Sequence, residues 1–456
     1  MTKCITQYDI FLDKDVQISF SLNDCFVETI SDEGTSDEES GNLRITIQFE
    51  TKSYSSLADA SIFTRAKYLS ILGILSYLLD EPLDVFGSSS QKRVIEDDYE
   101  QTTDNCLVID DVNYIDKLNE LLGKLQSSRS HEQELIFSLL DRWRKARYME
   151  NESEDSYLFN DESTLSYFHI LELLGDLCSR EIVAASKALL EEFCCNYNKE
   201  ILSLSGQALE SEAVAKAKIL SSVLDKDITV YAKISYFLKK HGLFEQRTAY
   251  WIKTLIEERN SVAHGRRVFY DKAIFPVQPF FPLTSVDMYP LEFLRILTAK
   301  VIATHIGISL YDDEWQDILK YLNYGEQATK QFINEFDNKP TALLSETERS
   351  IVFGGLNELI LSKKIKVASC INLYRFYINS DEEVDEFINE NIHAIILLLE
   401  ETDDTIFSDE LTRAIVRIYS AEEPPCFKCR DLIYYLDFHG FNISKLESLV
   451  LREIVR

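Results

Sequence analysis

Long runs that lack helix-breaking residues constrain the fold of this chain more than any other feature. Glycine occurs 14 times and proline 8 times among 456 residues, and these two residue types are the strongest interrupters of regular secondary structure. From about residue 112 onward, apolar side chains recur at helical spacing, as in 113–126, 131–150 and 161–179. Because 45% of the residues are hydrophobic, these helices have enough apolar surface to form a core. The sequence therefore predicts a mainly α-helical globular protein.

The first part of the chain follows a different pattern. Apolar residues alternate with other residues in VQISFSL (16–22) and in LRITIQF (43–49), and a period of two predicts β-strands. A helical pattern follows over 56–82 and ends before Pro82. The polar stretch 87–105 is expected to close this unit.

These patterns predict three domains, which is a reasonable number for a chain of this length. A small strand-plus-helix domain is expected over 1–110, a helical domain over 111–310, and a helical C-terminal extension over 311–456. Within the second domain, the helix over 161–179 opens with acidic and serine residues that are typical of an N-terminal cap.

The chain is strongly acidic, with 77 acidic against 47 basic residues and a formal net charge of −30. Broad binding to nucleic acid is therefore not expected, since non-specific binding needs a basic face. The acidic residues are concentrated in 31–40, 150–162 and 380–386, which we interpret as solvated loops and helix faces. A small local basic site is compatible with this charge balance.

The sequence shows no membrane or secretion signal. The N-terminal segment MTKCITQYDI has no apolar signal-peptide core. The longest apolar run, YLSILGILSYLL (68–79), is too short to span a bilayer and is predicted to be a buried helix. We therefore expect a cytoplasmic protein with reduced cysteines and no membrane partner.

The segment IEERNSVAHGRR (256–267) has the most unusual placement of charge. At about 100° per residue, Arg259 falls inside the apolar arc of a helix over 246–265, an arc that also includes Leu255 and Ala263. A buried guanidinium is costly unless it is paired. Its acceptor is therefore expected to be a carboxylate, a phosphate, or a cleft in a partner subunit.

Three polar side chains of this segment do not all point the same way. Asn260 and His264 are about 40° apart on the helix, whereas Arg259 and His264 diverge by about 140°. A bend near Gly265, the long reach of the arginine, or a second copy of the helix can bring them to one atom. The last arrangement predicts a cleft built from two chains.

The pattern RNSVAHG (259–265) resembles the Arg-Asn-x3-His pattern of HEPN domains, in particular the ApeA-like HEPN group of prokaryotic antiphage defence. LLDRWRKARYME (139–150) and LSYFHILELLGDL (165–177) resemble the first two helices of that family, and LEFLRILTAKVIATHIG (291–307) resembles the last. The resemblance covers about 131–310 and implies an HEPN-type helical bundle that dimerises through this domain.

The resemblance also implies a reaction. Active HEPN proteins are endoribonucleases that need no metal ion or other cofactor, and the 2′-hydroxyl of RNA attacks the adjacent phosphate. By this resemblance, His264 acts as general base or acid. Arg259 stabilises the charged transition state, and Asn260 orients His264 or the phosphate.

Further residues complete the expected site. Arg266, Arg267 and Lys272 form a local basic cluster that suits RNA phosphate and are predicted to bind the substrate. Glu172, on the helix that resembles the second HEPN helix, is predicted to be an auxiliary residue. The loop 268–283 is longer than a minimal HEPN connector and is expected to gate or cover the site.

The flanking regions carry no recognisable motif, and their expected roles belong to the ribonuclease hypothesis. The domain over 1–110 is expected to bind a phage or protein trigger, and 311–456 is expected to regulate the dimer or extend it. Two alternatives to a ribonuclease remain open. One is a non-catalytic HEPN scaffold in which Arg259 locks a dimer or a buried ion pair. The other is an adaptor whose acidic surface docks a basic partner or mimics nucleic acid.

Other motifs carry little chemistry. CFKC (426–429) has no second CxxC, although a helix that starts there would stabilise a thiolate. His169 shares a helix face with Glu172, which we interpret as packing. The chain has no phosphate-binding glycine loop, no serine-hydrolase motif and no histidine pair at metal-ligand spacing. No metal site is therefore expected.

Overall fold

The chain folds into two compact units. The structure is a computed structural model that describes residues 2–12, 15–30, 41–51, 60–83, 89–99, 104–152, 159–224, 228–263, 273–274, 281–282, 289–338, 344–380, 384–420, 429–438 and 440–449. Unit 1 comprises Met1–Leu243, Leu255–Tyr270 and Asp287–Trp315, and unit 2 comprises Phe244–Thr254, Asp271–Val286 and Gln316–Arg456. The domain boundary expected at 110 falls inside unit 1, whereas the boundary expected at 311 lies close to Trp315.

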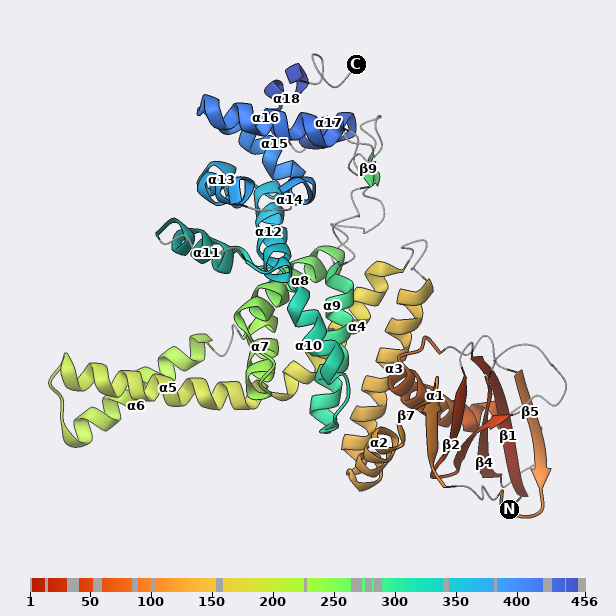
Figure 1. The fold of residues 1–456 in the computed structure, drawn as a ribbon. Helices are drawn as coiled ribbons and strands as arrows, with labels where there is room; N and C mark the ends of the chain where they lie inside the picture. The colour runs from red at the N-terminus through yellow and green to blue at the C-terminus, as the bar shows by residue number, and fades with distance from the viewer. Residues whose placement is uncertain are drawn as a thin grey trace. The chain divides into compact units, whose positions relative to one another are not determined.

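Unit 1 begins with a seven-stranded antiparallel sheet in the described part of the chain, at the red end of the colour range in Figure 1. The strand order is β5-β1-β4-β3-β2-β6-β7. The strands are β1 (Thr2–Leu12), β2 (Val16–Leu22), β3 (Cys25–Ile30), β4 (Gly41–Thr51), β5 (Ser89–Ile95), β6 (Cys106–Ile109) and β7 (Val112–Asn113).

Both strands predicted from alternation are confirmed. β2 coincides with 16–22 and buries its four alternating apolar residues, and β4 contains 43–49. The sequence patterns missed β1, which lies between β4 and β5. β1 is buried at five successive positions from Cys4 to Tyr8, so its side chains do not alternate between buried and exposed. The polar stretch 87–105 contains the edge strand β5.

Helix α1 (Ala60–Leu79) packs against this sheet. The ring of Tyr8 on β1 stacks on the ring of Tyr68 with centroids 4.0 Å apart, and the Tyr8 hydroxyl forms a 2.8 Å hydrogen bond with that of Thr64. Lys67 pairs with Asp24, between β2 and β3, at 2.6 Å. The predicted buried helix over 68–79 is confirmed, because most of its large apolar side chains are buried.

The remainder of unit 1 is helical. Among the residues that the structure describes, the further helices that belong wholly to it are α2 (Ile115–Ser127), α3 (Ser130–Glu152), α4 (Asn160–Leu177), α5 (Ser179–Glu200), α6 (Gly206–Leu224), α7 (Val230–Lys240) and α9 (Tyr289–Ile306). Helix α8 (Gln246–Ala263) has its first half in unit 2 and its second half in unit 1. The mainly helical architecture predicted from sequence is confirmed.

The predicted N-terminal cap of α4 is wrong. The N-cap residue is Phe159, which has no side-chain capping hydrogen bond. Asp161 and Glu162 lie instead in the first turn, where negative charge interacts favourably with the helix dipole. The acidic signal therefore marks the correct helix end through electrostatics and not through a capping hydrogen bond.

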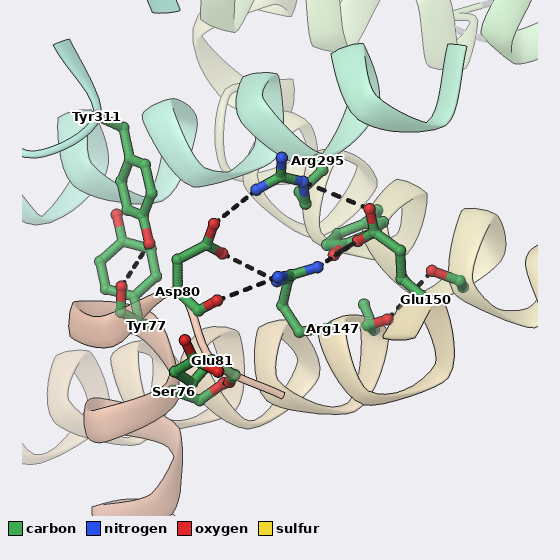
Figure 2. Close-up of polar contacts among 11 residues, drawn as sticks. Ser76, Tyr77, Asp80, Glu81, Arg147, Glu150, Arg295 and Tyr311 are labelled. Carbon is green, nitrogen blue, oxygen red and sulfur yellow. Dashed lines mark hydrogen bonds and ion pairs between the residues drawn. The ribbon is translucent and has the colours of Figure 1, made fainter. Parts of the chain in front are cut away.

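A partly buried ion network ties four helices of unit 1 together (Figure 2). Asp80, directly after α1, forms an ion pair with Nε of Arg147 on α3 at 2.9 Å and accepts a 2.6 Å hydrogen bond from Nη1 of Arg295 on α9. Glu150 on α3 contacts the same two arginines at 3.0 and 3.4 Å and accepts a 2.5 Å hydrogen bond from Tyr167 on α4. Burial disfavours the charge of Arg147, but Asp80 and Glu150 raise its pKa above the usual value.

An aromatic cluster lies beside this network. Tyr77 on α1 donates a 2.8 Å hydrogen bond to the carbonyl of Ala299 on α9, and Tyr311 donates a 2.5 Å hydrogen bond to the carbonyl of Tyr77. The ring of Trp143 on α3 lies 5.7 Å from the Tyr77 ring and 6.0 Å from the Tyr311 ring. The network and this cluster therefore link α1, α3, α4 and α9, and α4 carries the predicted site residue Glu172.

Unit 2 is a second helical core. It contains most of α10 (Asp312–Tyr321), together with α11 (Glu326–Asn338), α12 (Glu346–Leu361), the 3-10 helix η3 (Val367–Cys370), α13 (Ile371–Ser380), α14 (Val384–Glu390), α15 (Ile392–Glu401), α16 (Thr405–Tyr419), α17 (Cys429–Phe438) and α18 (Ser444–Leu449). Gly355 on α12 touches the chain before α11 so closely that a Cβ atom would lie 2.3 Å from the carbonyl oxygen of Tyr324. Across the described ranges, no helix combines the length and apolarity needed to cross a membrane.

Candidate functional site

Helix α8 presents the candidate residues near the edge of a buried face. Trp251, Ile252 and Leu255 are at most 4% exposed, which agrees with the apolar arc predicted from the sequence. Ala263, the last residue of the helix, is exposed. The prediction that the buried arc extends to Ala263 is therefore wrong, because the helix leaves the core before its C-terminal end.

Arg259 meets a carboxylate from another helix of the same unit. Its Nη2 lies 2.7 Å from Oε1 of Glu172 on α4, and the two side chains remain 24% and 21% exposed. Of the three acceptors expected for Arg259, the structure provides the carboxylate, within a single chain and at the margin of solvent. Glu172, predicted as an auxiliary residue, is the residue that receives the arginine.

A buried aromatic ring lies next to the guanidinium of this ion pair. The guanidinium carbon of Arg259 lies 5.9 Å from the ring centroid of Phe168, which is fully buried. Phe168 and Glu172 are four residues apart on α4 and therefore lie on one face of it. The cation–π contact and the ion pair together fix where the guanidinium lies. Phe168 was not among the predicted site residues, although its spacing from Glu172 is a signal that points to it.

Asn260 lies beside the ion pair and is exposed. Its Oδ1 accepts a 3.1 Å hydrogen bond from Nη1 of Arg259. A guanidinium has five N–H donors, and Glu172 and Asn260 each occupy one of them. Nε is buried without an acceptor in the described part of the chain, and Arg259 contacts Glu172 and Asn260 through its two Nη groups.

The other predicted site residues, His264, Arg266, Arg267 and Lys272, lie outside the described residues. Helix α8 ends at Ala263, directly before the histidine. Within the loop 268–283, the described residues form two short paired strands, β8 (Ala273–Ile274) and β9 (Phe281–Pro282). The position of His264 relative to Arg259 therefore stays a prediction from helix geometry.

The CFKC segment and His169 form no reactive site among the described residues. Cys426 lies outside the described residues, whereas Cys429 begins α17 and is buried, which raises its thiol pKa to about 11. The expectation that a helix start would stabilise a thiolate is therefore wrong for Cys429, because burial disfavours the charged form of its thiol. His169 is exposed on α4, so its interpretation as a packing residue is also wrong. In the part of the chain that the structure describes, no cluster of three or more potential ligands could hold a metal ion.

Comparisons of the chain with protein-family models, with curated proteins and with solved structures find no match. The similarity to HEPN domains therefore stays a prediction that depends on the RNSVAHG segment and its helical surroundings.

Proposed function

We propose that this chain is an HEPN-type endoribonuclease that needs no metal ion and acts as an effector of antiphage defence. The observation that carries the proposal is the environment of Arg259. Its guanidinium is held by Glu172 at 2.7 Å, yet about a quarter of its side chain stays exposed, at 24%. An arginine that binds phosphate needs a fixed position and an open side, and Arg259 has both.

In the proposed reaction, His264 removes the proton from an RNA 2′-hydroxyl, whose oxygen then attacks the adjacent phosphorus. The bond from phosphorus to the 5′-oxygen breaks, and that oxygen takes up a proton from a general acid, so the products are a 2′,3′-cyclic phosphate and a 5′-hydroxyl. Arg259 stabilises the added negative charge on the phosphoryl oxygens. Asn260 orients His264 or the phosphate through its amide group.

The remaining parts of the chain are given supporting roles. Arg266, Arg267 and Lys272 attract the RNA backbone to a chain that is otherwise acidic. A homodimer brings two sets of these residues into one cleft. The region 1–110 binds a trigger, and 311–456 regulates or extends the dimer.

The test is RNA cleavage by the full-length chain in the presence of EDTA, with analysis of the product ends, together with growth arrest on expression. Arg259→Ala and His264→Ala are expected to lower cleavage by about 100-fold or more. His169→Ala is the matched control, because His169 is an exposed histidine on α4 outside the motif. The proposal is overturned if wild type neither cuts RNA nor arrests growth, or if both motif variants cut as well as wild type.

A non-catalytic scaffold is the second candidate, and the carboxylate partner of Arg259 favours it. An arginine whose charge is already balanced by Glu172 within its own chain can serve only to fix α4 against α8. In that case Arg259→Ala lowers stability, and no variant changes cleavage because none occurs. The cleavage assay and an unfolding measurement on the same proteins separate the two functions.

A further inference from the structure

The helical hairpin formed by α5 and α6 carries an unusual amount of exposed apolar surface. Nine of the fifteen large hydrophobic side chains that are exposed in the described part of the chain lie between residues 189 and 223. Most of the other helices of the described chain direct such side chains into a core. An exposed apolar patch of this density marks a binding surface.

The apolar residues of α5 form two adjacent stripes, and α6 covers only one. The buried contact between the helices is small and consists of Cys194, Ala213 and Ala217, with Leu190 packed against them. The second stripe follows at intervals of four residues, with Leu189, Phe193, Tyr197 and the cap residue Ile201, which are 67%, 60%, 43% and 65% exposed. Residues four apart lie on one helix face, so this stripe is continuous.

Helix α6 adds apolar side chains to the same side of the hairpin. The Nζ of Lys216 lies 5.3 Å from the ring centroid of Tyr197, which places this side of α6 next to the exposed stripe of α5. Ile219 and Val223 lie within about 60° of Lys216 around α6 and are 66% and 57% exposed. In Figure 1, α5 and α6 run alongside each other. We infer that the exposed apolar side chains of both helices form one broad face. We call this surface the hairpin face, defined by Leu189, Phe193, Tyr197, Ile201, Ile219 and Val223.

The charge of the hairpin indicates what covers this face. Residues 179–224 contain five basic and six acidic side chains, a balance of −1, in a chain whose net charge is −30. A surface that recruits a basic partner to an acidic protein is expected to be acidic itself, and this one is not. Two copies of a strongly acidic chain repel each other least where each is nearly neutral.

The size of the face also fits a second copy. Six large apolar side chains that are 43–67% exposed present on the order of 600 Å², compared with roughly 800 Å² per partner in a standard stable interface. A helix pair with one open apolar side is half of a four-helix bundle, and a two-fold contact of two such pairs buries both faces at once.

We propose that the hairpin face binds the hairpin face of a second copy of this chain, which makes α5 and α6 a dimerisation module. This proposal does not depend on ribonuclease activity. It adds a self-association surface to the proposed two-copy cleft at the RNSVAHG segment.

The experiment compares full-length wild type with the double variant Phe193→Glu and Ile219→Glu by sedimentation and light scattering, from about 1 to about 100 µM. Wild type is expected to be a dimer. The dissociation constant of the variant's dimer is expected to be at least tenfold higher than that of wild type. Added salt is expected to strengthen the dimer, because it screens repulsion between chains of net charge −30. In hydrogen exchange, residues 189–223 of wild type are expected to gain protection as concentration rises.

The matched control is Ile406→Glu, at a side chain of α16 that is 71% exposed and belongs to unit 2. It is expected to leave the dimer unchanged, and circular dichroism checks that all variants keep their helices. A wild type that is monomeric over the whole concentration range overturns the proposal, as does a double variant that dimerises as tightly as wild type. Because cleavage is not measured, these outcomes are distinct from failure of the proposed function.

Discussion

Arg259 and Glu172 join α8 to α4 through an ion pair of 2.7 Å, at a depth where 24% and 21% of the two side chains remain exposed. This relationship lies between a surface ion pair, which contributes little stability, and a buried one, whose desolvation cost is large. The pair is therefore compatible with both a structural and a functional role. A structural role is tested by measuring unfolding, and a functional role by measuring RNA cleavage.

The stability contributed by this pair can be measured with a double-mutant cycle of Arg259→Ala and Glu172→Ala. We expect a coupling free energy of about 0.5–1 kcal/mol, since partial exposure screens the charges. Urea unfolding of the four proteins gives the value. The control is the pair Lys320–Asp317, whose side chains are 62% and 63% exposed. It is expected to give almost no coupling free energy. A coupling energy at Arg259–Glu172 as small as that of the control would contradict a structural role for the pair.

The position of Arg259 should also affect cleavage if the proposed function holds. Glu172→Gln keeps a hydrogen-bond acceptor for the guanidinium, whereas Glu172→Ala removes it. We therefore expect the alanine variant to lose about tenfold or more in kcat, and the glutamine variant to keep most of it. The expected change is in kcat and not in KM, because Glu172 acts by positioning. Equal losses of kcat in the alanine and glutamine variants would argue against positioning of Arg259 by a hydrogen bond.

The network in Figure 2 predicts a larger effect at Glu150. Its removal leaves Arg147 and Arg295 short of a partner and the Tyr167 hydroxyl without its acceptor. Glu150→Ala is therefore expected to lower the free energy of unfolding by about 2–3 kcal/mol. Glu134→Ala, at an exposed residue of the same helix, is expected to change it by less than about 0.5 kcal/mol. Comparable urea midpoints for the two variants would show that the network adds no stability.

Stability is predicted to fall in mild acid because of His305. Burial lowers the pKa of His305 below its ordinary value of 6.5, with a smaller opposite effect of Glu132 and a further lowering by His241. A histidine with a lowered folded-state pKa binds its proton more readily when unfolded, so its contribution is complete above pH 6.5 and declines below it. His305→Gln is expected to narrow the difference in melting temperature between about pH 7.5 and about pH 5.5. His169→Gln, at an exposed position, should not change it.

Two glycines are predicted to respond in opposite ways to alanine. At Gly355, a Cβ atom would meet the backbone oxygen of Tyr324 at 2.3 Å, so Gly355→Ala is expected to cost about 2 kcal/mol. At Gly123 in α2, nothing lies within 4 Å of an added Cβ, so alanine is expected to gain about 0.5–1 kcal/mol through helix propensity. Thermal unfolding measures both, and a stable Gly355→Ala protein would show that α12 can shift away.

The helices of this chain are largely predictable because their apolar spacing persists over many turns. Leu118, Leu121, Leu122 and Leu125 on α2 are all buried, as the amphipathic pattern requires. The strand β1 is not predictable in the same way. A central strand covered on both faces, such as Cys4 to Tyr8, loses the period of two that identifies β2.

The candidate site is only partly predictable, for a similar reason. The angle of Arg259 on α8 shows that it needs an acceptor, but helix periodicity says nothing about which distant residue supplies one. Glu172 was assigned a role by family resemblance, and Phe168 was not assigned one. Tertiary packing of α4 against α8 decides both contacts, and local sequence does not encode that packing.

The position of β1 inside the sheet has a consequence for folding during synthesis of the chain. β1 pairs with β4 on one side and with β5 on the other, so Ile5 lies between Gln48 and Arg93. β1 therefore waits for β5, a partner that is synthesised much later. Until that partner emerges, one edge of a largely apolar strand is open to other chains. The interval between the synthesis of β1 and that of β5 is thus a stage at which this strand is exposed to aggregation.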